Sequence, residues 1–194
     1  MFDSSCEDLA FSTEWYRWLA LTADYNWGKG VDYYPGHGLA PFLGRSRNAS
    51  LGLTFRPQPR LRLDESYIYS RLGATREWLP DAALGTGAIF NNHILRSKVN
   101  YQFSRELSLR AIFDYNGVLP NAALVSLDKS KRFGADVLLT YLLHPGTALY
   151  IGYSNVRENL AFDSLLSPAL QRTALPDTTT GRQVFIKLSY QLRY

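Results

Sequence analysis

The C-terminal segment, residues 181–194, alternates between apolar and polar side chains almost without interruption. The apolar positions are Val184, Ile186, Leu188, Tyr190, Leu192 and Tyr194. The positions between them are Gln183, Phe185, Lys187, Ser189, Gln191 and Arg193, which are polar except for Phe185. A period of two predicts a β-strand with one apolar face and one polar face.

A strand of this kind at the end of a chain favours a particular class of protein. A soluble domain seldom ends on an open, half-apolar strand, because an unpaired edge invites aggregation. In a membrane-spanning barrel the last strand pairs with another strand and completes the wall. The terminal pattern therefore favours a transmembrane β-barrel.

Seven further segments carry the same alternation, less cleanly. They are Trp15 to Trp27, Asn48 to Phe55, Leu61 to Ser70, Lys98 to Phe103, Leu107 to Asn116, Arg132 to Tyr141, and Leu149 to Ser154. Most run to roughly ten residues, enough for a tilted strand to cross a bilayer. We predict an all-β fold, an antiparallel transmembrane β-barrel of about eight strands with both termini on one side.

The connections predict the same plan, because short and long ones alternate. Tight turns are expected at Pro57–Pro59, Ser104–Glu106 and His144–Gly146, and long loops at Gly28–Gly44, Gly73–Gly87, Gly117–Lys129 and Arg157–Thr180. Short turns on one rim and long loops on the other are typical of outer-membrane barrels.

Composition sets broad limits. With 194 residues the chain is expected to form one domain, and its net charge of +4 is spread without the basic run that nucleic-acid binding would need. Cys6 is the single cysteine, so no internal disulfide can form. No apolar run reaches the ~20 residues of a transmembrane helix, and the first residues lack the features of a signal peptide. We therefore expect a C-terminal part of a larger barrel, with residues 1–12 poorly ordered and residues 13–194 forming the barrel domain.

Three charged residues do not fit the apolar faces on which the alternation places them. Arg17 and Arg71 lie near expected strand ends, where a long side chain can reach the interface. Glu65 lies in mid-strand, where contact with lipid is costly. Either a bulge turns Glu65 away or its strand faces protein.

The polar faces supply the candidate lumen-lining residues and lean basic. Two interpretations remain open: a channel that favours anions, as rings of Arg and Lys do, or ion pairs that fill a narrow interior. The candidates are Arg56, Arg62, Arg96, Lys98, Arg110, Asp114, Arg132, Asp136, Lys187 and Arg193.

Four stretches together resemble a bacterial family. They are Arg56–Asp64, Tyr101–Arg110, Leu139–Tyr153 and Gly181–Tyr190. In this order they resemble the C-terminal barrel region of a large family of uncharacterised outer-membrane proteins that carry an N-terminal module akin to family-9 carbohydrate-binding modules. The resemblance implies an outer-membrane location and contact with the barrel-insertion machinery. It also implies an insertion signal in the terminal strand at Leu188, Tyr190, Leu192 and Tyr194. The sugar-binding module lies outside the resemblance, and so sugar binding does not carry over.

No catalytic signature is present, and we predict no catalytic residue, no cofactor and no metal site. His37, His93 and His144 are far apart in sequence, and only His93 is placed where it could act as the base of a barrel hydrolase. Glu158 to Leu170 has apolar spacings that suit a short amphipathic helix, either folded over the barrel mouth or docking a partner.

The sequence thus predicts an outer-membrane pore or scaffold with a basic-leaning lumen, rather than an enzyme. The expected partners are outer-membrane lipid, the insertion machinery and small anionic or sugar solutes, with no nucleic acid. Two alternatives stay open: a receptor or accessory barrel in carbohydrate uptake, and a soluble lipocalin-like binding barrel.

Overall fold

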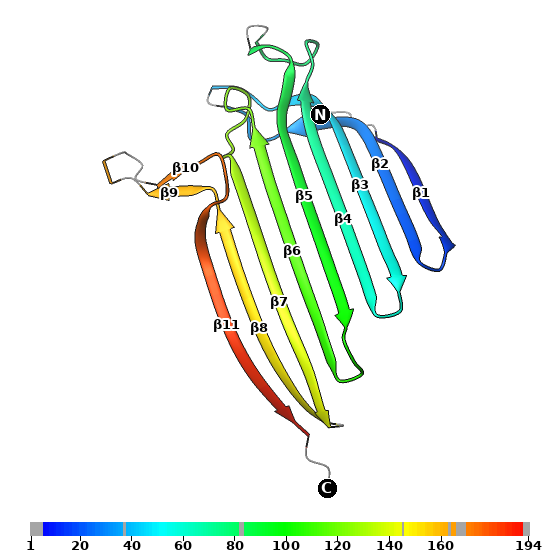
Figure 1. Ribbon diagram of the computed structural model, residues 1–194. Coiled ribbons are helices and arrows are strands. Elements are labelled where there is room, and N and C mark those ends of the chain that lie inside the picture. The colour runs from blue at the N-terminus through cyan, green and yellow to red at the C-terminus, as the bar shows by residue number, and fades with distance from the viewer. Residues whose placement is uncertain are drawn as a thin grey trace.

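The computed structural model describes residues 6–36, 38–81, 84–144, 146–162, 164–165 and 170–191. These residues form one antiparallel sheet of nine strands in the order β1-β2-β3-β4-β5-β6-β7-β8-β11 (Figure 1). The strands are β1 (Cys6–Tyr16), β2 (Leu19–Asp32), β3 (Phe42–Gln58), β4 (Leu61–Ala74), β5 (Gly87–Gln102), β6 (Leu107–Pro120), β7 (Ser130–His144), β8 (Thr147–Glu158) and β11 (Thr178–Tyr190). A separate hairpin of β9 (Leu160–Phe162) and β10 (Leu170–Arg172) stands on the connection from β8 to β11.

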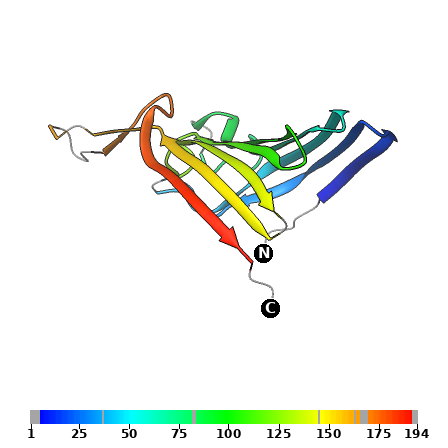
Figure 2. The same ribbon diagram turned by 60° about the horizontal axis from the view of Figure 1, so that its bottom comes forward.

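The prediction of an antiparallel all-β fold is confirmed, but the sheet is not closed. Strands β1 and β11 are its two edges, and Figure 2 shows them well apart on a twisted, curled sheet. A right-handed twist of this kind follows from the sterics of L-residues in extended strands.

The N-terminal part differs from the prediction. Trp15 to Trp27 is not one strand, because the chain turns at Arg17 and Trp18, and Tyr16 pairs with Leu19. The strand before this turn, β1, begins at Cys6, so residues 6–12, expected to be poorly ordered, are paired to β2. Residues 1–5 lie outside the described residues. Because of this added strand, β1 begins at the rim of the long connections and β11 ends at the rim of the tight turns (Figure 1). The first and last strands therefore do not place both termini on one side, contrary to the prediction from the sequence.

Short and long connections alternate as predicted. Tight turns join β1 to β2, β3 to β4, β5 to β6 and β7 to β8 at one rim, and the longer connections lie at the other. The four tight turns are displaced stepwise along the strand direction (Figure 1). A stagger of this kind is what tilted strands in a barrel wall produce.

Two other predictions need correction. The predicted strand from Lys98 to Phe103 covers only the end of β5, which begins at Gly87 and ends at Gln102, before Phe103. The predicted helix from Glu158 to Leu170 is wrong in its described parts, because Leu160–Phe162 and Leu170–Arg172 pair as a β-hairpin. Residues 163 and 166–169 lie outside the described residues.

Candidate functional site

One face of the sheet is apolar on all nine strands. Directly paired residues of neighbouring strands share a face, so the register gives each row of this face. In one row, Ala23 pairs with Leu51, Leu51 with Tyr67, and Tyr67 with Leu95. We call the central part of this face the apolar belt. It comprises Leu9, Phe11, Leu21, Ala23, Tyr25, Ala49, Leu51, Leu53, Leu63, Tyr67, Leu95, Val99, Leu109, Ala111, Phe113, Ala135, Val137, Leu139, Leu149, Ile151, Tyr153, Val184, Ile186 and Leu188.

About half of the belt residues are exposed and nearly all the others are half-buried, although Ala111 is buried. Leu51, in the middle of β3, is 48% exposed, and Ile186 on the edge strand β11 is 71% exposed. No element of the described chain packs over this face, and the buried apolar cluster lies elsewhere. An apolar surface of this extent is unusual on a protein surrounded by water.

Aromatic rings border the belt at both rims. Near the tight turns Tyr16 stacks on Trp18 at a centroid distance of 5.4 Å, and Tyr101 meets Phe103 edge-on at 4.7 Å. Near the long loops Tyr25 stacks on Trp27 at 5.3 Å. Aromatic residues prefer such boundaries, because one end of the ring system is apolar and the other is polar.

The opposite face is mixed but carries most of the charge of the sheet, including the predicted lumen-lining residues that the structure describes. Apolar residues also lie on it, among them Ile68, Ile94, Ile112, Leu138 and Phe185. Direct pairing places Arg62, Arg96, Lys98, Arg110, Asp114, Arg132, Asp136 and Lys187 on this face. Arg56 lies just beyond the last regular pair of β2 and β3 and lines a hollow with Ala20 and Thr54 of the same face. Arg193 lies outside the described residues. The predicted residues thus share one face of the sheet, and the proposal that this face lines a lumen stays a prediction.

Two ion pairs neutralise part of this charge. Arg96 binds Asp114 across β5 and β6, with Nε 2.5 Å from Oδ1, and Arg62 binds Asp64 along β4, with Nε 2.9 Å from both carboxylate oxygens. Among the described residues the other five predicted cations of this face form no ion pair, so the polar face leans basic. They are Arg56, Lys98, Arg110, Arg132 and Lys187.

Two hollows lie along the polar face. One, of about 450 Å³, is lined by Arg62, Asn100 and Arg110 near the tight turns. The other, of about 350 Å³, is lined by Asp114, Arg132 and other residues nearer the long loops. The first hollow is cationic, since Arg60 also lines it and no acidic residue does, and a cationic hollow suits small anionic solutes. The second is balanced, because Arg96 and Arg132 face Asp114 and Asp136.

Glu65, the residue that fitted the apolar face worst, does lie on that face. It pairs with Leu53 and Ser97, and the Ser97 hydroxyl donates a hydrogen bond to its carboxylate. No bulge turns Glu65 away, and no other element covers its strand. One hydrogen bond from Ser97 therefore satisfies part of a carboxylate in the middle of an apolar surface.

His93 lies on the apolar face between two tyrosines. Its Nδ1 is 2.8 Å from the Tyr67 hydroxyl, and its ring centroid is 5.0 Å from that of Tyr69. Ser97 shares the face but lies four residues along β5, about 13 Å away at ~3.3 Å per residue. The structure thus joins His93 to tyrosine, whereas Ser97 bonds Glu65.

His37 lies outside the described residues, and His144 ends β7. Within the described ranges, no three histidine, cysteine, aspartate or glutamate side chains converge as a metal site requires. The same part of the chain holds no helix long and apolar enough to cross a bilayer.

The buried core is small and lies at the long-loop rim, which sequence reasoning missed. Its members are Phe42, Leu72, Ala74, Ile89, Leu124 and Val125. The loop after β2 and the loop after β6 meet there. The Gly36 amide donates a hydrogen bond to the Leu124 carbonyl at 2.8 Å, and Pro35 and Val125 form an isolated antiparallel pair. The two loops together cover the end of the polar face.

Asp32 ends β2 beside this core and is almost fully buried, with 4% of its surface exposed. Its Oδ1 accepts a hydrogen bond from the Tyr34 amide at 3.0 Å, and its Oδ2 has no partner among the described residues. Burial raises the pKa of the Asp32 carboxyl, and the Tyr34 amide offsets only part of that rise.

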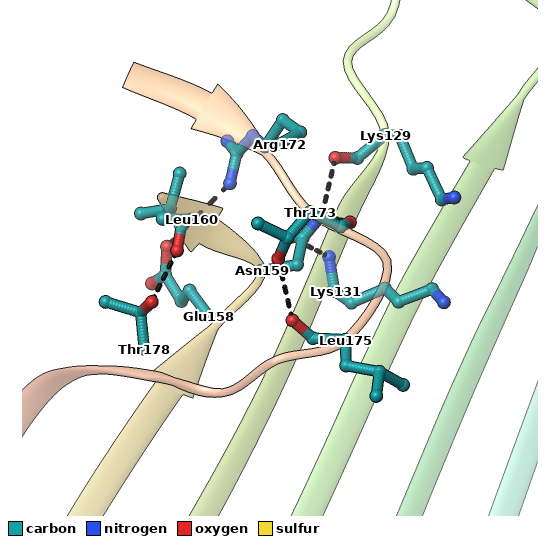
Figure 3. A network of polar contacts seen from close by, with 9 residues as sticks. All are labelled: Lys129, Lys131, Glu158, Asn159, Leu160, Arg172, Thr173, Leu175 and Thr178. Atoms are coloured by element: carbon teal, nitrogen blue, oxygen red, sulfur yellow. Dashed lines mark hydrogen bonds and ion pairs between the residues drawn. The ribbon is translucent and has the colours of Figure 1, made fainter. Parts of the chain in front are cut away.

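Asn159 organises the connection from β8 to β11 (Figure 3). Its side chain is fully buried and makes three hydrogen bonds to backbone: Oδ1 accepts from the Lys131 amide at 2.7 Å, and Nδ2 donates to the carbonyls of Lys129 and Thr173 at 3.2 and 3.1 Å. One amide side chain therefore ties the β9–β10 hairpin to the start of β7.

The terminal strand is the exposed edge of the sheet. Leu188 and Tyr190, two of the predicted insertion-signal residues, are 64% and 68% exposed on the apolar face. Leu192 and Tyr194 lie outside the described residues.

Comparison with protein families, with curated proteins and with solved structures finds no match to this chain. The resemblance to the outer-membrane family therefore stays a prediction.

Proposed function

We propose that this sheet is part of the wall of a transmembrane β-barrel in a bacterial outer membrane. Its apolar face would contact lipid, and its polar face would line a water-filled lumen. The observation that carries the proposal is the exposed apolar belt, continuous over nine strands and bordered by aromatic rings at both rims. Outward apolar bands with aromatic girdles are typical of outer-membrane barrels.

The open edges support a barrel larger than this sheet. In hydrocarbon an unpaired backbone amide or carbonyl costs several kcal/mol, so a lipid-facing sheet must have no free edge. Strands β1 and β11 each leave one side unpaired over 11 and 13 residues. We therefore propose that the wall closes with further strands, as the predicted C-terminal part of a larger barrel would require.

For the lumen we propose a role in conduction of small anionic solutes. Arg96 and Arg62 are neutralised by aspartates, whereas Arg110 and Arg132 line the hollows without an ion pair among the described residues. A ring of unpaired cations favours anions. We also propose that the exposed terminal strand, with Leu188 and Tyr190, is the segment that the insertion machinery recognises.

Cysteine accessibility tests the orientation of the faces. The sample is the protein in the membranes of the cells that produce it, with Cys6→Ser removing the native thiol. In this protein Leu51→Cys and Ser50→Cys each introduce one thiol, on opposite faces of β3. A charged maleimide that cannot cross membranes should label Ser50→Cys through the lumen, and should label Leu51→Cys only after detergent is added. Equal labelling of both thiols in intact membranes would refute the proposed orientation.

Planar-bilayer recordings test conduction. In a KCl gradient, the reversal potential of the full protein should indicate anion preference, and Arg110→Glu with Arg132→Glu should shift it toward cation preference. Arg105→Glu, in the turn from β5 to β6, is the matched control and should leave the reversal potential unchanged. An inserted protein without conductance would leave a scaffold role and exclude a pore.

A further inference from the structure

Four basic residues gather on the apolar face where it meets the long-loop rim. They are Lys29 on β2, Arg45 and Arg47 on β3, and Arg71 on β4, and we call them the rim cation cluster. Arg47 pairs directly with Trp27 on one side and with Arg71 on the other, and Arg45 pairs with Lys29. Directly paired residues share a face, so all four side chains project from the lipid side of the proposed wall.

The cluster is poorly neutralised by the protein. Within the described ranges none of the four forms an ion pair, and Lys29 lies over the ring of Trp78 with its Nζ 5.9 Å from the centroid. Like charges placed directly opposite one another destabilise a sheet. An anion from outside the sheet would relieve the repulsion between Arg47 and Arg71.

The side chains border two hollows that share Arg45 and Arg47. The larger, of about 650 Å³, is walled by Tyr25, Trp27 and Trp78, with Glu7 as its one acidic residue. The smaller, of about 220 Å³, lies between Arg47 and Arg71. Aromatic walls with guanidinium groups offer apolar contact and charge side by side.

The height of the cluster on the sheet points to lipid. Along β3 the chain passes from Leu51 and Ala49 in the belt to Arg47 and then to Arg45, at about 7 Å for each pair of residues. Arg47 is therefore one step beyond the belt, level with Trp27, and Arg45 is two steps beyond it. On a membrane-spanning wall this is the level of the headgroups.

We propose that the rim cation cluster binds the phosphate groups of a lipid in the leaflet on the long-loop side. The inference rests on the proposed function, because it needs the apolar face to contact lipid. Arginine forms paired hydrogen bonds to phosphate oxygens, and two adjacent arginines can hold one phosphomonoester. Long loops of outer-membrane barrels are extracellular, so the phosphate groups would belong to a lipid of the outer leaflet.

Binding is measured on the purified full protein in an uncharged detergent, by the fluorescence of the tryptophans, two of which line the larger hollow. The probes are bisphosphorylated lipid A, the same lipid without its phosphates, and inorganic phosphate. Arg45→Gln with Arg47→Gln should weaken binding of the phosphorylated lipid roughly tenfold or more, since each tenfold is about 1.4 kcal/mol. Arg17→Gln with Arg105→Gln removes the same charge at the opposite rim and should change it less than twofold.

Each outcome decides the proposal. Equal binding of the dephosphorylated lipid would overturn it, and displacement of the lipid by equimolar inorganic phosphate would make this a site for free anions. Glu7→Gln removes the acidic residue of the hollow without touching the arginines, and should tighten binding twofold or more. A loss of binding in Glu7→Gln would contradict the electrostatic argument. If the protein stays monodisperse in water without detergent, the proposed function fails; if it inserts and Arg45→Gln with Arg47→Gln binds normally, only the lipid site fails.

Discussion

Replacing Asn159 with alanine should release the β8–β11 connection from the sheet. The change removes the three side-chain hydrogen bonds to Lys131, Lys129 and Thr173 and keeps the two backbone bonds of residue 159, from its amide to the Lys131 carbonyl and from the Thr173 amide to its carbonyl. At about 1 kcal/mol net for each hydrogen bond, Asn159→Ala should cost about 3 kcal/mol. The cost is greater if water cannot reach the Lys131 amide, because a buried donor without a partner carries its full desolvation penalty.

The loss should be local before it is global. The described part of the β9–β10 connection is held to the sheet through Asn159 and through the Lys131 ammonium on the Ala174 carbonyl at 2.6 Å. Thr178 on the Leu160 carbonyl and the ion pair of Arg172 with Glu158 add to this. Limited proteolysis of the folded protein should therefore cut this segment of Asn159→Ala at least tenfold faster than in the unchanged protein. Urea unfolding in detergent, followed by tryptophan fluorescence, gives the change in the free energy of unfolding.

Two variants sharpen the result. Asn121→Ala removes one hydrogen bond to the Ala123 amide at an exposed loop position, and should cost less than 1 kcal/mol. Asn159→Asp keeps the acceptor but turns a carboxylate oxygen toward two carbonyls, so at neutral pH it should be at least as harmful as alanine. Proteolysis of Asn159→Ala at the unchanged rate, with less than 0.5 kcal/mol of destabilisation, would refute the anchoring role.

Three further predictions concern the rim, the belt and the core. Asp32→Asn should stabilise the folded protein at neutral pH, because burial raises the pKa of the Asp32 carboxyl and so disfavours its charged form. The neutral carboxyl carries no such penalty below the unfolded pKa, and the penalty grows as pH rises through the folded pKa. The advantage of the variant, measured by urea unfolding, should therefore vanish near pH 3. Glu65→Leu should stabilise the protein in lipid vesicles by about 1 kcal/mol, since a carboxylate leaves the apolar belt; destabilisation would instead show that the bond from Ser97 matters more. Gly44→Ala should cost about 1–3 kcal/mol in thermal unfolding, because a Cβ there would lie 2.9 Å from the Gly73 carbonyl oxygen; an unchanged melting temperature would contradict this close packing.

The parts of the fold that could be predicted are those in which alternation and turn residues agree. The terminal segment from Gly181 and the turns at Pro59 and Gly146 combine a period of two with residues that end strands. For these segments the sequence therefore specified strand direction, the two faces and the rim of the connections. It missed the turn at Arg17 and Trp18, which no such residue marks. It did not specify whether the sheet closes, because closure depends on the partners of the edge strands.

Strands with mixed faces escaped prediction. The part of β5 before Lys98 places Asn91, His93 and Ser97 on the apolar face, so its pattern resembles a loop. The helix expected after Glu158 shows the opposite error: the leucine spacing fits a helix, but Asn159 fixes the backbone so that Leu160–Phe162 pairs as a strand. Tertiary hydrogen bonds overrode a local pattern in this case.

The face on which the rim cation cluster lies could be predicted in part from the sequence. Arg45 and Arg47 have the same parity along β3 as Ala49 and Leu51, so alternation places them on the apolar face. Arg71 was recognised as a misfit, but its meeting with Arg47 required the register of β3 and β4. Charged residues that continue the alternation beyond the end of an apolar segment therefore indicate a charged border of the apolar face.

The junction between the loops after β2 and β6 also constrains the shape of the molecule. It joins residues 34–36 to residues 124–126, although β4 and β5 lie between the strands that carry them. A junction of this kind connects two separated parts of the curved sheet, and the lengths of its loops limit how strongly the sheet can curve. Shortening either loop would bend the sheet more tightly, and breaking the junction would let the strands relax toward a flatter array. In the proposed barrel, these two loops would therefore help to set the diameter of the wall.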